Sequence, residues 1–449
     1  MTTAKKFLSI ALVLLMVASL GFAQGSKEAA PKTGKTDLTV LYYIDMSEPN
    51  SANEIAMIWD VFAKENPDIN VIREDLFNEP FHQKTEAYAA SGNLPDVVYM
   101  WPGGRSTTLH TQHLTKDLRP FLEKDGLVAS YAPAAIANQT AGYLAELPNG
   151  ITSSHMMYAN TKLLKENGLE LPKTYEDLKK IQTVLKAKGI EVIGMDNKDQ
   201  WVMQSCLFSL IVGRYGGANW YDDLAAGKIN FQDPWFVKSL ELVNDLYSSG
   251  LLNRNTLDVS YGSGRGNFAN GRAAFYIDGD WSAASFQTDI TTGKALISPA
   301  AQASDFELMV FPALPGEVIS NTTSGVVGTG FGISSNIPAG SAKEDAAWRL
   351  VKFLQGEYVQ TYRLSTGASF PSNLKVDVAK VIKDNNLEPF VQKRAEFYTQ
   401  YGTTPVIDGV LHSDVFNVIN QGLQEIGLGS KTPAQVAADV QKAWVAFNK

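Results

Sequence analysis

The sequence predicts an α/β protein of two lobes, each with a mainly parallel sheet flanked by helices. Short β-rich runs alternate with amphipathic helical segments near the N-terminus. This alternation implies right-handed crossovers between parallel strands. In addition, 449 residues are too many for one ordinary hydrophobic core. We therefore expect two lobes, each with its own core.

The first predicted elements alternate between strand and helix. In order, they are strand 37–44, helix 54–66, strand 69–73, helix 81–91 and strand 96–100. The first helix carries Ile55, Ile58, Trp59 and Phe62 at helical spacing, which indicates one buried face. Gly92 is well placed to end the second helix.

Helices dominate the prediction for the rest of the chain. Thr174 and Asp177 resemble a capping box that opens a helix ending near Gly189. An apolar run over 306–311 is typical of a strand that returns to a sheet. The other helices are expected over 161–167, 234–249, 344–362 and 433–447.

The N-terminus is typical of an export signal. Lys5 and Lys6 precede an apolar run over 7–20, and small residues lead to Ala23, where we expect cleavage. An uncleaved N-terminal anchor stays open as the alternative. Because this region has no cysteine, no lipid anchor is expected. Residues 24–36 are predicted to be a flexible leader.

The net charge and the cysteine content limit the classes of function that the chain can have. The formal net charge is −8, which argues against binding to nucleic acid because that requires a basic face. Cys206 is the only cysteine and has apolar neighbours. It therefore forms no intramolecular disulfide, and we expect a buried core thiol.

Five short motifs follow one another along the chain, each occurring once. They lie at 94–101 (LPDVVYMW), 158–174, 268–281, 311–316 and 343–354. Together they resemble the sugar-binding, maltose-binding-protein-like family of bacterial extracellular solute-binding proteins. The resemblance covers most of the chain beyond the predicted leader.

The resemblance implies two lobes joined by hinges, with ligand bound in the cleft between them. Lobe 1 would hold 37–147 and 312–354, and lobe 2 would hold 148–306 and 355–449. The hinges would lie near 148–151, 306–312 and 352–356. The protein would be a periplasmic monomer that passes a carbohydrate to the membrane permease of an ABC importer. It would need no cofactor or metal.

Sugars present apolar faces and a rim of hydroxyl groups, which suit aromatic rings and polar side chains respectively. Trp101 follows a predicted strand and precedes a glycine-rich turn, so we expect it in the cleft. Trp281 and Tyr158 match aromatic residues that reach the ligand in the family. Asp280 and Asp45 are candidates for hydrogen bonds to hydroxyl groups.

Further candidates are less specific. Gly330 and Phe331 could line the cleft floor. Thr152 stands where the maltose-binding relative has a carboxylate, which puts maltodextrin in doubt as the ligand. A polyol or a glycerol phosphodiester is the alternative cargo. Glu48, Trp201, Trp220, Tyr221 and Arg265 also enter the candidate set, with loop, core or surface roles favoured for them.

A secreted glycosidase is the main rival function. Such an enzyme needs two carboxylates at a fixed separation, and no spacing among Asp45, Asp278 and Asp280 singles out such a pair. His110 and His113 could form half of a metal site, but no further ligand motif accompanies them. The sequence also lacks a nucleophile elbow. The sequence therefore favours a binding protein over an enzyme.

Overall fold

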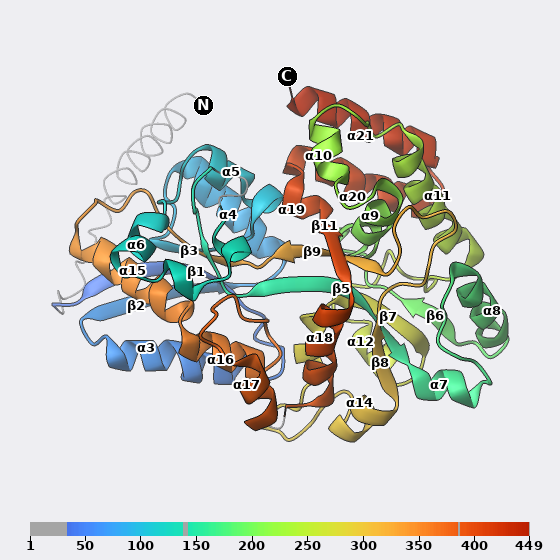
Figure 1. The fold of residues 1–449 in the computed structure, drawn as a ribbon, viewed down its shortest axis with the longest axis horizontal. Helices are drawn as coiled ribbons and strands as arrows, with labels where there is room; N and C mark the ends of the chain where they lie inside the picture. The colour runs from blue at the N-terminus through green and yellow to red at the C-terminus, as the bar shows by residue number, and fades with distance from the viewer. Residues whose placement is uncertain (1–33, 138–141, 385–386, 449) are drawn as a thin grey trace, which may run out of the picture.

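The computed structural model describes residues 34–137, 142–384 and 387–448. The predicted signal peptide and most of the predicted leader lie outside these residues. The described residues form two α/β halves, left and right in Figure 1, with β5 and β9 at the centre between them. None of the described helices is long and apolar enough to cross a membrane.

The first sheet has five strands in the order β2-β1-β3-β10-β4. Strand β1 pairs in parallel with β2 and β3, whereas β10 runs antiparallel to β3 and β4. The predicted parallel arrangement therefore holds for the first three strands. The bounds are β1 Thr36–Tyr43, β2 Ile69–Leu76, β3 Val97–Met100, β4 Leu147–Pro148 and β10 Gly330–Ile333.

The second sheet is also mixed. Its order is β11-β9-β5-β7-β6, and β8 pairs with β5 outside this path. Three strands, β7, β8 and β9, run antiparallel to β5, so the predicted mainly parallel arrangement does not hold for this sheet. The bounds are β5 Ile151–Asn160, β6 Glu191–Gly194, β7 Ala273–Gly279, β8 Phe306–Met309, β9 Thr322–Val327 and β11 Gly402–Pro405.

Helices flank both sheets (Figure 1). In the first half they are α2 Ser51–Glu54, the π-helical turn η1 Ile55–Trp59, α3 Asp60–Glu65, α4 Glu79–Ser91, η2 Gly103–Ser106, α5 Thr107–Thr111, α6 Arg119–Lys124, η3 Val128–Ser130, η4 Pro133–Ile136, α15 Ala342–Leu354, α16 Glu357–Ser365 and α17 Val378–Asp384.

The second half carries the remaining helices. They are α7 Thr161–Glu166, α8 Tyr175–Lys186, the π-helical turn η5 Met203–Phe208, α9 Ser209–Gly216, α10 Trp220–Ala225, α11 Pro234–Ser249, α12 Arg265–Ala269, α13 Ser282–Ser285, α14 Pro299–Ser304, α18 Pro389–Gln400, α19 Ile407–Val410, α20 Ser413–Gly427 and α21 Pro433–Phe447.

Local sequence signals explain most helix ends. The predicted capping box is present at α8, where Thr174 and Asp177 bond reciprocally. Gly92 ends α4 in the left-handed conformation, at φ 67°. The single helix predicted over 344–362 is wrong, because the chain breaks between α15 and α16. There, Gly356 adopts an extended conformation before α16 begins.

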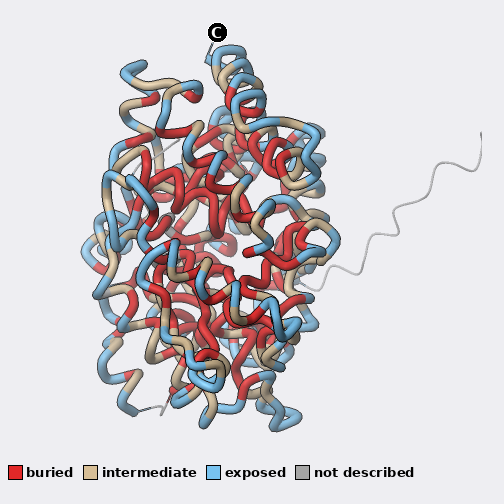
Figure 2. The backbone as a smooth tube through the Cα atoms, turned by 90° about the vertical axis from the view of Figure 1, so that its right-hand side faces the viewer, coloured by how far each residue is buried: buried red, intermediate tan, exposed pale blue. Residues whose placement is uncertain are grey.

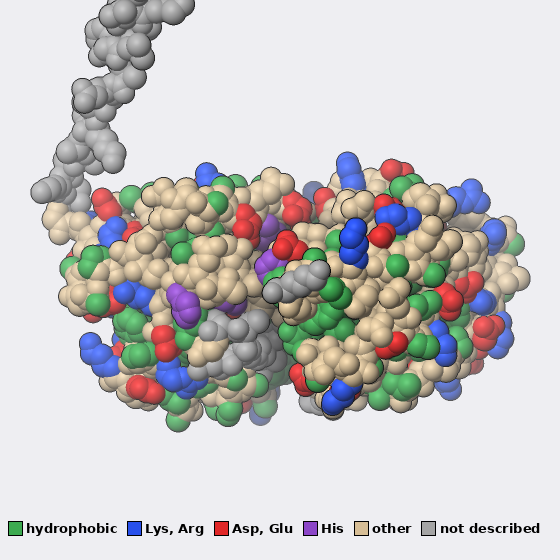
Figure 3. All heavy atoms as spheres, turned by 90° about the horizontal axis from the view of Figure 1, so that it is seen from above, with side chains coloured by type: hydrophobic (Ala, Val, Ile, Leu, Met, Phe, Trp, Pro, Cys, Tyr) green, Lys and Arg blue, Asp and Glu red, His purple; other side chains and the backbone are tan. Residues whose placement is uncertain are grey.

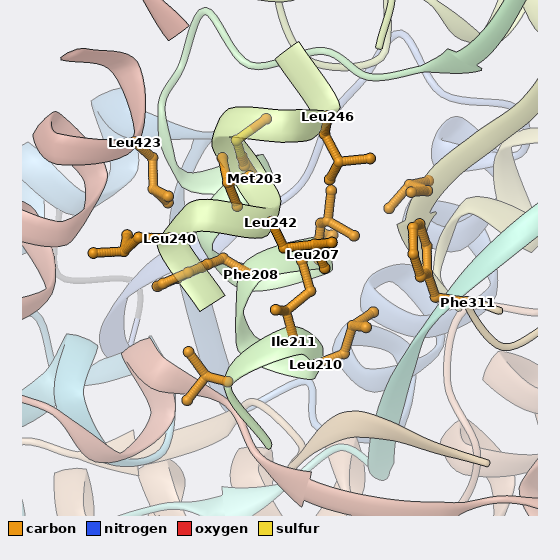
Figure 4. Packing of buried hydrophobic residues seen from close by; sticks show 14 of the residues in the cluster. Met203, Leu207, Phe208, Leu210, Ile211, Leu240, Leu242, Leu246, Phe311 and Leu423 are labelled. Atoms are coloured by element: carbon orange, nitrogen blue, oxygen red, sulfur yellow. The ribbon is translucent and has the colours of Figure 1, made fainter. Parts of the chain in front are cut away.

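Each half has its own apolar core. Buried residues run through the interior of the molecule in Figure 2. The largest cluster lies in the second half and includes Phe208, Leu246 and Phe311, shown in Figure 4. Cys206 belongs to this cluster and is fully buried, as predicted. A separate cluster between β1, β10 and α15 includes Leu38, and it fills the first half.

Two stretches of chain that connect the halves meet at one buried amide, Asn149, which also binds the turn between α15 and α16. Its backbone N–H donates to the Thr329 carbonyl oxygen at 2.7 Å. Its Oδ1 accepts from Gln355 Nε2 at 2.7 Å and from Arg363 Nη1 at 2.6 Å. Asn149 precedes β5, Thr329 lies between β9 and β10, and Gln355 follows α15. Asn149 therefore joins the two connections to the turn that follows α15.

Shortening a core side chain should destabilise the second half. Leu246 is fully buried, so Leu246→Ala is expected to lower the free energy of unfolding by about 2–5 kcal/mol. The matched control is Leu428→Ala, because Leu428 is 70 % exposed, and it should stay within about 0.5 kcal/mol of the parent. Urea unfolding followed by circular dichroism measures both. Equal losses would contradict the assigned core.

Candidate functional site

A cavity of about 330 Å³ lies between the two halves and takes its lining from both. Tyr43 and Asp45 come from the carboxyl end of β1, and Trp101 directly follows β3. Trp201 and Trp281 come from the second half. The carboxyl ends of strands in open α/β sheets are the usual place for ligands. The position therefore marks this cavity as the candidate ligand site.

Aromatic rings from the first half form one wall. The ring of Trp101 lies 4.8 Å from the ring of Tyr43, at 83°. It also lies 4.7 Å from His82 and 5.2 Å from Tyr99. These edge and tilted contacts hold the indole in a fixed orientation. The wall is thus rigid, and Trp101 keeps partial exposure at the cavity.

Rings from the second half form the facing wall. Trp281 donates from Nε1 to the Tyr261 hydroxyl oxygen at 2.6 Å. Trp201 lies 4.8 Å from the Tyr261 ring and 6.3 Å from the Trp281 ring. Tyr261 therefore links the two indoles. Aromatic surface faces the cavity from both halves.

Arg265 opens α12 and is buried beside the cavity. Its Nη1 pairs with Glu48 of the first half. Its Nη2 donates to the Tyr261 hydroxyl at 2.9 Å and lies 3.6 Å from Asp278 Oδ2. Burial alone would lower the pKa of Arg265, but Tyr261, Asp278, Glu48 and other neighbours favour its charged form and raise the pKa overall.

Two further arginines line the cavity, each beside a carboxylate. Arg105 Nε donates to Asp408 Oδ2 at 2.8 Å. Arg363 Nη2 lies 3.6 Å from Glu54 Oε1. Both guanidinium groups are buried. Burial favours the neutral form, yet the nearby negative charge raises the pKa of each arginine. They stay charged and paired.

Two histidines of the lining are neutral. Both ring nitrogens of His155 form hydrogen bonds with serine hydroxyl groups. Ser324 Oγ lies 2.6 Å from Nδ1, and Ser205 Oγ lies 3.3 Å from Nε2. Burial lowers the pKa of His155 to about 4. Burial, with the positive charge of Arg105, also holds the pKa of His82 well below its ordinary value. Neither ring adds positive charge at neutral pH.

The halves touch across the cavity. Trp201 Nε1 donates to Asn78 Oδ1 at 3.1 Å, and Asn50 Nδ2 donates to the Thr288 carbonyl oxygen at 3.1 Å. Gly103, at φ 69°, packs so closely on Gly409 that a Cβ atom would lie 1.7 Å from the Gly409 oxygen. Only glycine permits this approach. The structure therefore shows the two halves in contact around the cavity.

Three residues predicted for the site line the cavity together: Asp45, Trp101 and Trp281. Three residues for which sequence reasoning favoured other roles also line it: Glu48, Trp201 and Arg265. In contrast, Trp220 is fully buried in the core, and Tyr221 packs against the same core.

Tyr158, Asp280, Gly330 and Phe331 lie outside the cavity lining. Tyr158 is buried in a separate core cluster and donates to the Gly279 carbonyl oxygen at 3.0 Å. Asp280 is buried and pairs with Arg394. Phe331 and its neighbour Gly330 lie in β10, and Phe331 packs behind the lining residue Tyr42, 5.9 Å away. Thr152 lies on β5 opposite Val326, and its side chain falls outside the described part.

Sequence reasoning missed several lining residues: Tyr43, Tyr99, Tyr261, Arg363 and Asp408. Tyr43 and Tyr99 lie at or near the ends of predicted strands, the same signal that identified Trp101. The others come from loops and helices distant in sequence, where no local pattern marks them.

The described residues offer no alternative metal centre. Among residues 34–137, 142–384 and 387–448, no three His, Cys, Asp or Glu side chains are grouped to hold a metal ion. His110 pairs with Glu146 at 3.2 Å, and His113 stacks on Tyr143 at 4.8 Å. The two histidines therefore have separate structural partners.

Comparison with known proteins supports this geometry. The chain is 24 % identical to a multiple sugar-binding protein of Streptococcus mutans over 75 % of each chain. A structure from work on xylan utilization by Caldanaerobius polysaccharolyticus superposes with a TM-score of 0.79 and 20 % identity, covering 90 % of this chain and 99 % of that one. A maltose-bound MalE3 structure of T. maritima superposes with a TM-score of 0.71 and 19 % sequence identity. The match covers 91 % of this chain and 98 % of that one.

These structural likenesses establish the fold, which is that of two-lobed periplasmic binding proteins. The family model for bacterial extracellular solute-binding proteins matches residues 47–361. That span includes Trp101, Trp201 and Trp281 of the cavity lining and most strands of both sheets. The chain therefore belongs to the bacterial extracellular solute-binding protein family.

Proposed function

We propose that the protein is a receptor that binds a carbohydrate in the cavity between its halves and delivers it to an ABC importer. Members of its family are receptors rather than enzymes. One observation carries the carbohydrate assignment: indole and phenol rings face the cavity from both halves, with carboxylate and guanidinium groups beside them. Rings suit the apolar faces of sugars, and the polar groups suit hydroxyls.

The relatives support the same substrate class. The Streptococcus mutans relative is named a multiple sugar-binding protein, and the T. maritima structure holds maltose. The cavity volume of about 330 Å³ is near the lower end of ordinary ligand pockets, about 300–1,000 Å³. It therefore favours a mono- or disaccharide over a long oligosaccharide. A polyol or a glycerol phosphodiester is the second candidate cargo.

The halves provide the two lobes of such a receptor. We start from the predicted assignment of 37–147 and 312–354 to one lobe, and of 148–306 and 355–449 to the other, and propose two changes. Residues 312–327 move to the second lobe, because β9 lies in the second sheet. Helices α16 and α17 move to the first lobe, because Val359 of α16 packs in the first core and α17 packs on α16. Because β9 pairs with β5 and β10 pairs with β3, we place the second hinge at Gly328 and Thr329. Ligand would shift the equilibrium toward the closed arrangement.

We further propose export to the periplasm, with cleavage near Ala23, and a monomer that docks on a membrane permease when closed. The family assignment as extracellular agrees with export. Acidic and basic side chains are interspersed on the face shown in Figure 3. Such a mixed surface suits a monomer that meets its partner transiently and does not favour nucleic acid.

A thermal-shift screen tests the function. The purified protein is heated with monosaccharides, disaccharides, oligosaccharides, polyols and phosphorylated polyols. A ligand that binds only the folded state raises Tm by mass action. We expect a sugar to raise Tm and to bind with micromolar affinity, which corresponds to a binding free energy of about −8 kcal/mol. A hit confined to non-sugars would overturn the carbohydrate assignment while leaving the receptor fold in place.

Removing a stacking ring should weaken binding without unfolding the protein. Trp281→Ala removes the indole that faces the cavity beside Tyr261. We expect sugar affinity to fall about 10-fold or more, which is at least about 1.4 kcal/mol. Isothermal titration calorimetry measures the loss. Tyr358→Ala, at a side chain outside the cavity and 45 % exposed, is the control. Global unfolding of Trp281→Ala would assign Trp281 to the core instead.

The neutral histidine should make the protein sensitive to acid. The pKa of His155 is about 4 in the folded protein and about 6.5 when unfolded. The unfolded chain therefore binds more protons between these values, so stability present above pH 6.5 is lost as pH falls toward 4. The loss reaches about 3 kcal/mol from this one group.

The variant His155→Asn removes that contribution. Its unfolding free energy should change less steeply between pH 6.5 and 4 than that of the parent, and the lowered pKa of His82 contributes to the remaining slope. Urea titrations at several pH values give both curves. Parallel curves for parent and variant would show that folding does not lower the pKa of His155.

A further inference from the structure

The charges that line the cavity are balanced before any ligand enters. Among the described residues, the lining holds three guanidinium groups, of Arg105, Arg265 and Arg363, and no lysine. It also holds four carboxylates. The histidines of the lining are neutral, as shown above. The cavity wall therefore carries one more negative charge than positive.

Every guanidinium group of the lining has an acidic partner. Arg105 pairs with Asp408, Arg363 with Glu54, and Arg265 with Glu48. Two of them have a second acid nearby. Asp278 lies 3.6 Å from Arg265, and Glu79 lies 4.0 Å from Arg105. No guanidinium charge in this lining is left to meet an anion.

The remaining carboxylate is Asp45. Its Oδ1 accepts from the Ser47 backbone N–H at 2.8 Å and from Ser47 Oγ at 2.6 Å. Within the described structure it forms no ion pair. The unbalanced negative charge of the wall therefore lies at the carboxyl end of β1, beside the space that a ligand would fill.

An anionic ligand would meet two costs in this cavity. It would lie near the charge of Asp45, and such a like-charge contact costs several kcal/mol. It could gain a guanidinium partner only by displacing Glu48, Glu54 or Asp408, which would leave a buried or partly buried carboxylate without its counter-ion. A neutral sugar meets neither cost, because its hydroxyl groups can bond to both members of each ion pair.

We infer that the cavity selects uncharged polyhydroxy ligands and rejects their phosphorylated or carboxylated counterparts, because its three guanidinium groups are already neutralised by the protein's own carboxylates. This inference rests on the proposed carbohydrate receptor function. It separates a neutral sugar or polyol from the glycerol phosphodiester alternative. Glu48 and Arg265, which come from opposite halves, are the specificity-determining pair.

Calorimetry with matched probes tests the inference. Glucose, galactose, xylose, maltose and cellobiose are titrated first, each at low salt. Glucuronate, galacturonate, glucose 6-phosphate and glycerol 3-phosphate follow. For the neutral sugar that binds, we expect its charged counterpart to bind at least about 100-fold more weakly. Equal or tighter binding of the charged counterpart overturns the inference and leaves the receptor function standing.

A variant provides the second arm. Glu48→Gln removes the acidic partner from Arg265 Nη1 but keeps a hydrogen-bonding group of similar size. We expect the ratio of neutral to charged affinity to shrink about 10-fold or more, even where both affinities fall because a contact between the halves is lost. Glu65→Gln, on the exposed surface of α3, should leave the ratio unchanged.

The outcomes separate the two proposals. An unchanged ratio in Glu48→Gln would overturn the role of the ion pair. If neither a neutral nor a charged sugar binds, and glycerol 3-phosphate binds instead, both the carbohydrate function and the inference fail. Unfolding curves of each variant confirm that the binding values refer to folded protein.

Discussion

The structure depends on one buried amide that must satisfy its hydrogen bonds at the junction of the two halves. Asn149 accepts from Gln355 and Arg363 and donates to Thr329. A buried polar group without such partners would cost about 1–3 kcal/mol. Because Thr329 lies on the other connection and Gln355 and Arg363 follow α15, the geometry of the two connections is coupled to that of the first half. The same Arg363 pairs with Glu54 at the cavity wall, so hinge and binding site share a side chain.

Much of the fold follows from local sequence patterns. The strand–helix alternation over 37–100 places three parallel strands side by side, as found. Caps such as Thr174 and Gly92 locate helix ends because they act on adjacent backbone. The prediction of helix ends fails where a partner distant in the sequence determines the local structure. The break at Gly356 accompanies the use of Gln355 by Asn149, about 200 residues away in sequence.

The site was predictable only in part, for the same reason. Trp101 stands at a strand end, where the sheet itself fixes its position. Tyr158 lies on a central strand, and its side chain points into a core, since alternate strand residues face opposite sides. Asp280 forms an ion pair with Arg394, which lies more than 100 residues later in the sequence. The pairing of Glu48 with Arg265 spans 217 positions, so neither residue carries a local signal.

The internal pairing of Arg105, Arg265 and Arg363 has a consequence for capture outside the cell. A site that attracts its ligand through unpaired charge weakens as salt rises, because screening lengths shrink to about 8 Å at physiological ionic strength. Here each guanidinium charge is paired within about 4 Å with a buried or partly buried carboxylate, and dissolved ions screen such pairs much less than exposed charges. Ligand capture by such a receptor would therefore depend little on the salt concentration of its surroundings.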